Sequence, residues 1–131
     1  MSVIDIAIVP VARERRDEYI AFSKRMAEVY RDHGATRIVD YWQADGEADQ
    51  QSFHGAEYEE GDLRGIASAV GASASEAVVV SITEWPSQQV RDRGTAAAAK
   101  DPRVLATLDE KPVFDGARLL GDSFTVALEV R

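Results

Sequence analysis

A chain of 131 residues, 45% hydrophobic and 29% charged, can bury one hydrophobic core, so we expect a single domain over residues 1–131. The formal net charge of −8 disfavours nucleic acid as a partner, because phosphate binding requires clustered lysine and arginine. The sequence has no cysteine. None of its apolar runs approaches the length of about 18 residues that a membrane-spanning helix needs. We therefore expect no disulfide, no membrane partner and a cytoplasmic location.

The first elements are a strand and a long helix. Residues 3–11 are almost wholly apolar and β-branched, which predicts a strand that is covered on both faces. From about residue 13, apolar side chains such as Tyr19 and Met26 recur at steps of three and four, which predicts an amphipathic helix of about five turns. Gly34 follows at once and can adopt the left-handed conformation that ends such a helix.

The middle of the chain is less regular. Residues 35–43 are predicted to form a second strand. Residues 44–75 are rich in turn formers and glycine, so we predict an insertion of loop and short helix there. Asp62 is expected to cap the short helix, over about residues 63–70.

The second half repeats the order of strand and helix. Residues 76–85 contain a β-branched run that predicts a strand, and Pro86 stops it. Ser87 can then cap a helix that runs through the alanine-rich segment, and a short helical turn follows at 103–108. Apolar and other residues alternate strictly over 124–130, which predicts the last strand.

This order, strand-helix-strand repeated twice, predicts an α+β, ferredoxin-like fold with a four-stranded antiparallel sheet and both helices on one face. A doubly wound parallel sheet would require a glycine-rich turn after the first strand, and Val9-Pro10-Val11 is not such a turn. Two helices cover one face only, whereas the first strand is apolar on both. We therefore predict that a second copy of the sheet covers the other face, as a homodimer forming a dimeric α/β barrel.

Short motifs along nearly the whole chain carry a family resemblance. They are Val3-Ile4-Asp5, Val9-Pro10-Val11, Asp32-His33-Gly34-Ala35, Val80-Ser81, Pro86-Ser87, Arg91-Asp92, Asp101-Pro102-Arg103, Phe114-Asp115-Gly116-Ala117-Arg118, Gly121 and Phe124. With them the chain resembles the DUF1428 family of small bacterial proteins of unknown function. The resemblance implies a dimeric α/β barrel, a group that includes heme-degrading and cofactor-independent monooxygenases, isomerase-like enzymes and ligand-sensing modules. The chain departs from the family where His54 follows the Ser-Phe pair, a place that often holds proline.

The two histidines do not predict a metal site. His33 stands at the end of the first helix, where a cation interacts favourably with the helix dipole. His54 lies near acidic residues but lacks the spacing of a metal-ligand pair, and a loop histidine explains it equally. Glycine-rich phosphate loops and nucleophile-elbow motifs are absent from the sequence. We predict no metal and no cofactor, and we keep His54 as a candidate ligand-binding residue.

Acidic residues inside apolar strands are the candidates for catalysis. They are Asp5, Asp40 and Glu84, and burial can raise the pKa of such a carboxyl group into a range suited to acid or base catalysis. Each can instead pair with an arginine, such as Arg37 or Arg118, or lie at the dimer interface.

Large aromatic residues are the remaining candidates for binding. Tyr41, Trp42, Trp85 and Phe114 can line a small-molecule cavity, although plain core packing also explains them. Arg118 can bind a carboxylate of the protein or of a ligand. Two functions stay open. The homodimer binds or transforms a small, partly apolar molecule, or it is a non-catalytic ligand sensor or structural dimerisation module.

Overall fold

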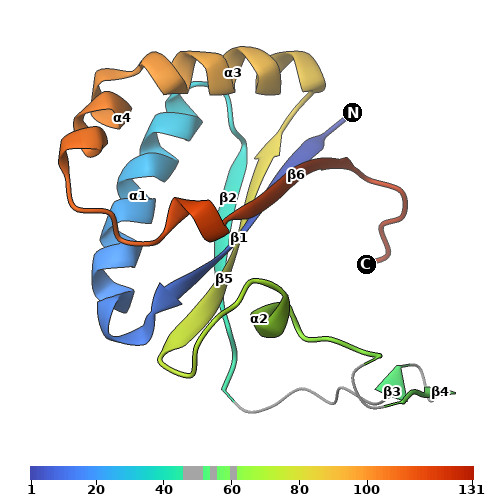
Figure 1. Cartoon of the computed structure of the whole chain (residues 1–131). Helices are drawn as coiled ribbons and strands as arrows, with labels where there is room; N and C mark the ends of the chain where they lie inside the picture. Colours follow the sequence, from blue (N-terminus) through green and yellow to red (C-terminus); the bar gives the residue numbers. More distant parts are fainter. Residues whose placement is uncertain (46–51, 54–55, 60–61) are drawn as a thin grey trace.

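The computed structural model describes residues 1–45, 52–53, 56–59 and 62–131. Four strands form an antiparallel sheet in the order β2-β5-β1-β6, which is the ferredoxin-like order (Figure 1). The strands are β1 (Val3–Ala12), β2 (Arg37–Trp42), β5 (Glu76–Trp85) and β6 (Leu120–Thr125). The two long helices are α1 (Arg16–Asp32), which follows a 3₁₀ turn at Arg13–Arg15, and α3 (Gln88–Lys100). The α+β fold predicted from the order of elements is confirmed.

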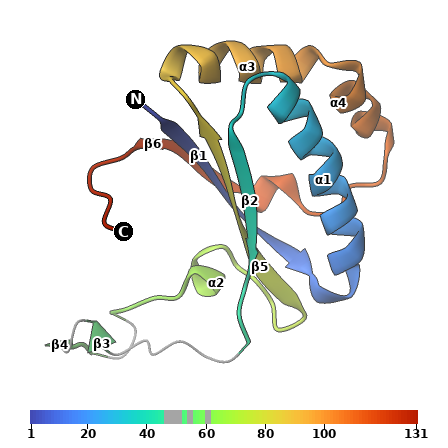
Figure 2. The same cartoon turned by 180° about the vertical axis from the view of Figure 1, so that it is seen from behind.

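Shorter elements connect these units. Between β2 and β5 lie the small hairpin of β3 (Ser52–Phe53) and β4 (Ala56–Glu57), and the helix α2 (Ile66–Ala69). Between α3 and β6 lie α4 (Pro102–Ala106) and 3₁₀ turns at Thr107–Asp109 and Gly116–Arg118. Seen from behind, α3 crosses one end of the sheet and α1 runs along it (Figure 2). Part of the predicted insertion at 44–75 lies outside the described residues.

The strand register separates two faces of the sheet. Asp5 on β1 is opposite Thr83 on β5 and Ser123 on β6, while Asp40 on β2 is opposite Ser81. This face is covered by α1 and α3, as the contacts of Asp5 and Asp40 with those helices show. We call the opposite side the open face. Pro10 and Val78 of this face are buried. Its other apolar members are Ile4, Ile6, Ile8, Val39, Tyr41, Val80, Ile82, Leu120 and Phe124. None of these side chains is fully buried, and Tyr41, Leu120 and Phe124 are about half exposed.

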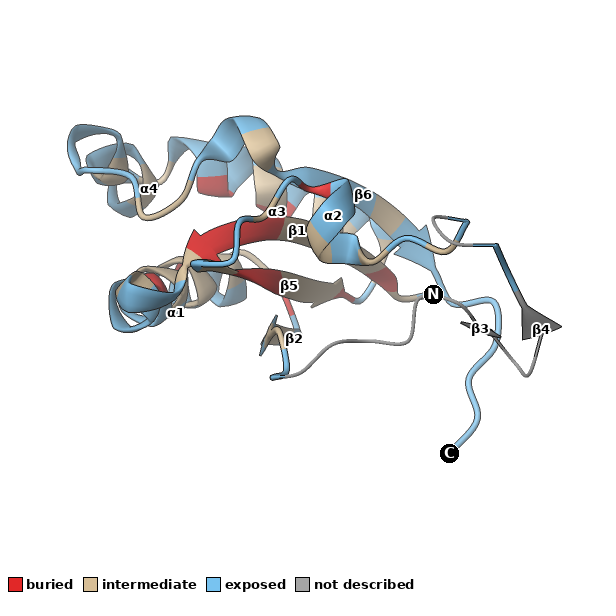
Figure 3. Ribbon diagram, turned by 60° about the horizontal axis from the view of Figure 1, so that its bottom comes forward, coloured by how far each residue is buried: buried red, intermediate tan, exposed pale blue. Residues whose placement is uncertain are grey.

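The core lies between the covered face and the helices. Val9, Val11, Tyr19 and Val79 form its centre, with Phe114 among the side chains packed against it. Figure 3 shows the buried residues concentrated on β1 and β5, the two central strands. The covered face carries the stiff, β-branched side chains of Val9, Val11 and Val79 at this centre, and smaller residues such as Ala7 and Ser81 further along the same strands.

Trp85 is the largest buried side chain and sits beneath α3. Its ring is 0% exposed and meets the Tyr30 ring edge-on, with 6.3 Å between centroids. A Cβ atom at Gly94 would lie 2.9 Å from Cη2 of this ring and 2.5 Å from the carbonyl oxygen of His33. Only glycine therefore lets α3 approach the sheet and the end of α1 so closely.

The helix ends largely follow the predicted signals. Gly34 has a φ of 112° just after the end of α1, and Ser87 Oγ accepts the N–H of Val90 at 3.2 Å. The predicted cap at Asp62 is wrong. Its carboxylate instead accepts the N–H of Glu59 within a tight turn, and α2 begins after Gly65 without a side-chain cap.

The position of the last strand also differs from the prediction. The alternating residues 124–130 were expected to form it, but β6 spans Leu120–Thr125. Thr125 is opposite Val3, the first residue of β1, so the chain beyond it has no strand to pair with. Leu128 and Val130 are consequently about 80% exposed. Within the described residues, no helix has the length and apolar character needed to cross a bilayer.

Candidate functional site

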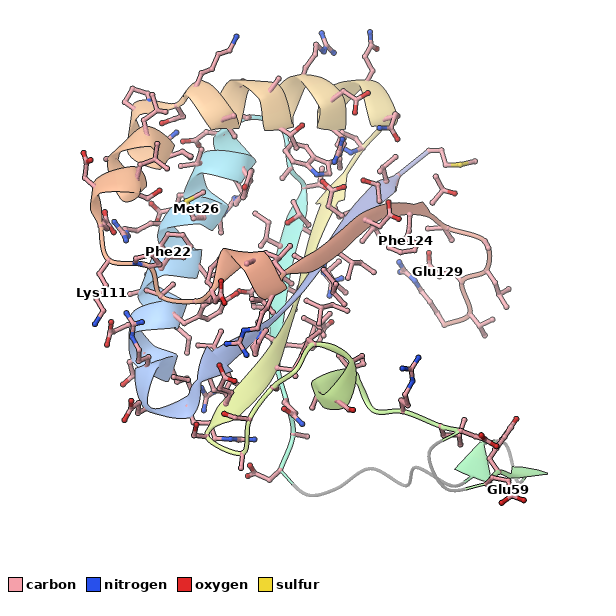
Figure 4. The ribbon with its side chains drawn as sticks, viewed as in Figure 1. Phe22, Met26, Glu59, Lys111, Phe124 and Glu129 are labelled. Carbon is pink, nitrogen blue, oxygen red and sulfur yellow. The ribbon has the colours of Figure 1, made fainter. Side chains whose placement is uncertain are left out.

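A cavity of about 240 Å³ lies between α1 and the covered face of the sheet. Five hydroxyl groups line it, from Tyr19, Ser23, Tyr30, Ser81 and Thr83. Its apolar walls come from Ala7, Val9, Phe22, Met26, Ala27, Ile38, Phe114 and Leu119. Figure 4 shows two of these side chains, Phe22 and Met26, projecting from α1 beside the segment that carries Lys111. The cavity is therefore mostly apolar, with polar groups that are hydroxyls rather than charges.

Asp40 anchors two of these hydroxyls. Tyr19 Oη donates to Asp40 Oδ2 at 2.9 Å, and Ser23 Oγ donates to the same oxygen at 2.5 Å. Asp40 Oδ1 is buried and has no hydrogen-bond partner among the described residues, which is costly for a carboxylate oxygen. Because both hydroxyl protons are directed at Asp40, the oxygens of Tyr19 and Ser23 offer lone pairs to a ligand in the cavity.

Burial is the main cause of a raised pKa at both cavity tyrosines. The pKa of Tyr19 is raised first by burial and then by the negative charge of Asp40. The pKa of Tyr30 is raised by burial and, to a smaller extent, by the charge of Asp5. Both phenols therefore stay protonated at neutral pH. Within the described part of the chain, the Tyr30 hydroxyl has no hydrogen-bond partner, which leaves its proton free for a ligand.

Asp5 holds a second polar cluster at the far end of the sheet. Its carboxylate accepts the indole N–H of Trp85 at 3.1 Å, the Nε–H of Arg91 at 3.1 Å and the hydroxyl of Ser123 at 2.5 Å. These bonds join β1, β5, α3 and β6. Of the two alternatives for this carboxylate, pairing with an arginine is the one seen, but the partner is Arg91 of α3 rather than Arg37 or Arg118.

The Asp5 cluster borders a smaller cavity of about 200 Å³. Asp5, Trp85 and Thr95 line this cavity, which shares the wall residues Ala7, Tyr30, Ser81 and Thr83 with the larger one. Tyr30 thus stands between the two. Asp5 thus lines the smaller cavity, and Asp40 is linked to the larger one through the hydroxyls of Tyr19 and Ser23.

Three of the other sequence candidates lie away from the cavities. Glu84 belongs to the open face, opposite Ile4 of β1, and Tyr41 lies on that face and is 50% exposed. Arg118 lies just before β6 and pairs with Glu76, with 2.6 Å between Nη2 and Oε2. This bond lowers the pKa of Glu76 to about 2.

The remaining candidates have mixed positions. Trp85 lines the smaller cavity and Phe114 the larger one. Trp42 packs against the core, with the guanidinium of Arg16 5.1 Å from its ring centroid. His54 lies outside the described residues.

His33 forms a polar contact between two helices. His33 Nε2 lies 2.9 Å from Asp101 Oδ2, which ties the end of α1 to the start of α4. Asp101 also pairs with Arg103 at 2.8 Å. Among the residues that the structure describes, no three histidine, aspartate or glutamate side chains are grouped so as to hold a metal ion.

The hydroxyls of α1 are functional groups that the sequence alone does not single out. The period of the helix places Tyr19 in its apolar stripe, and no sequence pattern indicates a role for Ser23 or for the Tyr30 hydroxyl. One signal was available, since Tyr19 and Ser23 are four residues apart and therefore share a helix face. Their common partner could not be read from the chain, because Asp40 lies on a separate strand.

Comparisons with known proteins place this geometry in context. The model of the family described as "Protein of unknown function (DUF1428)" matches residues 2–116. The uncharacterized protein YbaA of Escherichia coli (strain K12) is 30% identical over 124 residues, which cover 95% of each chain. YbaA of Shigella flexneri matches with the same identity and coverage.

Two solved structures are similar along almost the whole chain. SnoaB, a cofactor-independent oxygenase from Streptomyces nogalater, superposes with a TM-score of 0.53 at 13% identity, over 98% of this chain and 96% of its own. A point mutant of MhuD, with two manganese protoporphyrin IX molecules bound per active site, gives a TM-score of 0.50 at 19% identity, over 98% of both chains. At these identities the likeness shows a shared fold.

Proposed function

Because the chain belongs to the DUF1428 family, whose description gives no function, we propose from the geometry that it binds a small, largely apolar molecule in the cavity beneath α1. The observation that carries the proposal is a hollow of about 240 Å³ next to a half-buried carboxylate, one oxygen of which is buried and has no hydrogen-bond partner among the described residues. Protein interiors are normally close-packed, and buried polar atoms are normally hydrogen-bonded. A site that departs from both rules at one place is suited to a ligand.

The polar groups define the kind of molecule. The described lining of this cavity contains no lysine or arginine, so an anionic group would enter it without a partner. Tyr19 and Ser23 accept hydrogen bonds from the ligand, while Tyr30 can donate one. The ligand is therefore neutral, with an apolar body and hydroxyl or carbonyl groups placed between these side chains.

An enzymatic form of the proposal uses Asp40. Its carboxylate is positioned to draw a proton from a ligand hydroxyl through Ser23 or Tyr19, which both contact it. The likeness in fold to a cofactor-independent oxygenase is compatible with such chemistry and does not establish it. If Asp40 takes no proton from the ligand, the same cavity is the binding site of a ligand sensor. The substitution Asp40→Asn separates the two, because it keeps the shape of the site and removes the base.

The open face supports a homodimer. Its apolar side chains form a continuous surface across all four strands, and the helices α1 and α3 lie on the other side. Contiguous apolar surfaces of this kind mark interfaces. Two sheets packed through their open faces would leave each cavity beneath its own α1, outside the interface. Ligand binding and pairing can therefore be tested independently.

The first test is native mass spectrometry of freshly purified protein, followed by titration with the neutral fluorophore N-phenyl-1-naphthylamine. The proposal predicts retained small-molecule mass or saturable binding of the fluorophore. Ala27→Phe places a ring in the cavity and is expected to abolish binding. Ala21→Phe is the matched control, because Ala21 is an exposed residue of the same helix.

The outcome also decides between the two functions. Saturable binding that Ala27→Phe removes and Ala21→Phe retains supports the ligand site. A protein that carries no added mass and binds no fluorophore is instead a structural dimerisation module, and the proposed binding is then wrong.

A further inference from the structure

A second hollow lies on the outer side of α1. It has a volume of about 320 Å³ and lies between α1 and residues 107–116, the segment that connects α4 to β6. We call residues 107–116 the strap. Thr107, Leu108 and Lys111 are among the residues that line this outer pocket. The outer pocket thus takes most of its lining from the strap, whereas the cavity of the proposed site lies against the sheet.

Two aromatic rings belong to both hollows. Phe22 of α1 and Phe114 of the strap line the outer pocket and also the cavity beneath α1. Their rings meet edge-on, with centroids 6.1 Å apart and an angle of 72° between planes. Phe114 makes a similar contact with Tyr19, at 6.2 Å. The pair is therefore a common wall, with the outer pocket on one side and the hydroxyls over Asp40 on the other.

Polar contacts at the surface hold the strap in place. Arg25 donates to both carboxylate oxygens of Glu110, at 3.0 and 2.7 Å, and Arg15 Nη1 donates to the carbonyl oxygen of Pro112 at 2.9 Å. The Arg25 guanidinium also lies 5.7 Å from the centroid of the Phe22 ring. The side chains of Arg25 and Glu110 are 54% and 42% exposed, and exposed ion pairs are weak. These polar contacts therefore add little to the resistance against lifting the strap, and the packing of Phe114 against Tyr19 and Phe22 supplies most of it.

We propose that Phe22 and Phe114 form a gate through which a ligand passes from the outer pocket to the cavity beneath α1. This inference rests on the proposed function and adds its route of entry. Residues 110–115 belong to no helix or strand, so a movement of Phe114 breaks no regular hydrogen bonding. Arg25 sets how readily this happens, because it contacts Phe22 and holds Glu110.

The gate is tested by the rate of binding. Stopped-flow mixing of the full chain with N-phenyl-1-naphthylamine gives the association rate constant. Phe114→Ala opens the wall, and we expect association to become about tenfold faster, as when a conformational step ceases to limit binding. Phe124→Ala is the matched control, since Phe124 lies on β6 on the open face, away from the strap (Figure 4), and its rate should equal that of the wild type.

A second variant keeps the test decisive if Phe114→Ala fails to fold. Arg25→Gln releases Glu110 and alters no residue that lines the cavity, so it should also speed association while leaving the capacity for fluorophore unchanged. Saturable binding that Ala27→Phe abolishes, with wild-type rates in both Phe114→Ala and Arg25→Gln, would overturn the gate and leave the proposed function intact. Absence of saturable binding to the wild type would overturn both.

Discussion

The substitution Gly94→Ala is expected to destabilise the fold although alanine is the better helix former. In an open helix the exchange gains about 1 kcal/mol. Here the new Cβ would lie 2.5 Å from the His33 carbonyl oxygen, which is backbone, and still closer to Cζ3 of the buried Trp85 ring. Neither neighbour can yield without moving α1 or the core. Overpacking of this kind costs about 1–3 kcal/mol, and a contact with backbone belongs at the upper end.

The expected net loss is about 1–2 kcal/mol in the free energy of unfolding, or roughly 4 °C in Tm per kcal/mol. Urea denaturation followed by Trp fluorescence measures it. Gly116→Ala is the control, because a Cβ there meets nothing within 4 Å, and it should leave stability nearly unchanged. A Gly94→Ala protein as stable as the wild type would refute the reasoning that α3 needs glycine to approach Trp85.

Three further predictions concern single side chains. Ser87→Ala removes the N-cap of α3 and should cost about 1 kcal/mol in urea denaturation, while an unchanged midpoint would contradict the cap. Because the bond from Arg118 lowers the pKa of Glu76 to about 2, from 4.5 in the unfolded chain, its stabilisation is present above about pH 4.5 and is lost as pH falls towards 2. The stability difference between wild type and Glu76→Gln, measured by denaturation across this range, should therefore shrink on acidification, and a constant difference would argue against the ion pair. Ile6→Glu places a charge in the middle of the open face and should convert the proposed dimer to a monomer in native mass spectrometry. A dimer that persists would place the interface elsewhere.

Elements with strong local signals were predictable from the sequence. The strand β5 was predicted at its observed bounds, because a β-branched run ends at Pro86, where the backbone can no longer donate to the ladder. The long helix α1 followed from its apolar period and from Gly34. In both cases the chain itself carries the physical cause, so no partner needs to be known.

Elements whose limits depend on a partner were not predictable. Alternation continues to Val130, but β6 stops at Thr125, because β1 offers no residue beyond Val3 to pair with. The partners of Asp5 and Asp40 were likewise not predictable, although both residues were recognised as candidates, because those partners lie far away in the chain. Arg91 is 86 residues from Asp5, and Tyr19 is 21 residues from Asp40 on another element. Such distances in the chain leave no local pattern.

The central position of β1 has a consequence for synthesis of the chain. β1 is translated before the other strands of its sheet, yet its neighbours are β5 and β6, and the bonds from Asp5 to Trp85 and Ser123 span 80 and 118 residues. This nascent strand, apolar on both faces, therefore has no sheet partner until β5 emerges, and its second edge stays unpaired until β6 follows. Unpaired apolar strands are prone to aggregate at this stage, and an embedded charge opposes it. We expect Asp5 to keep the growing polypeptide from mispairing before it has anything to bind.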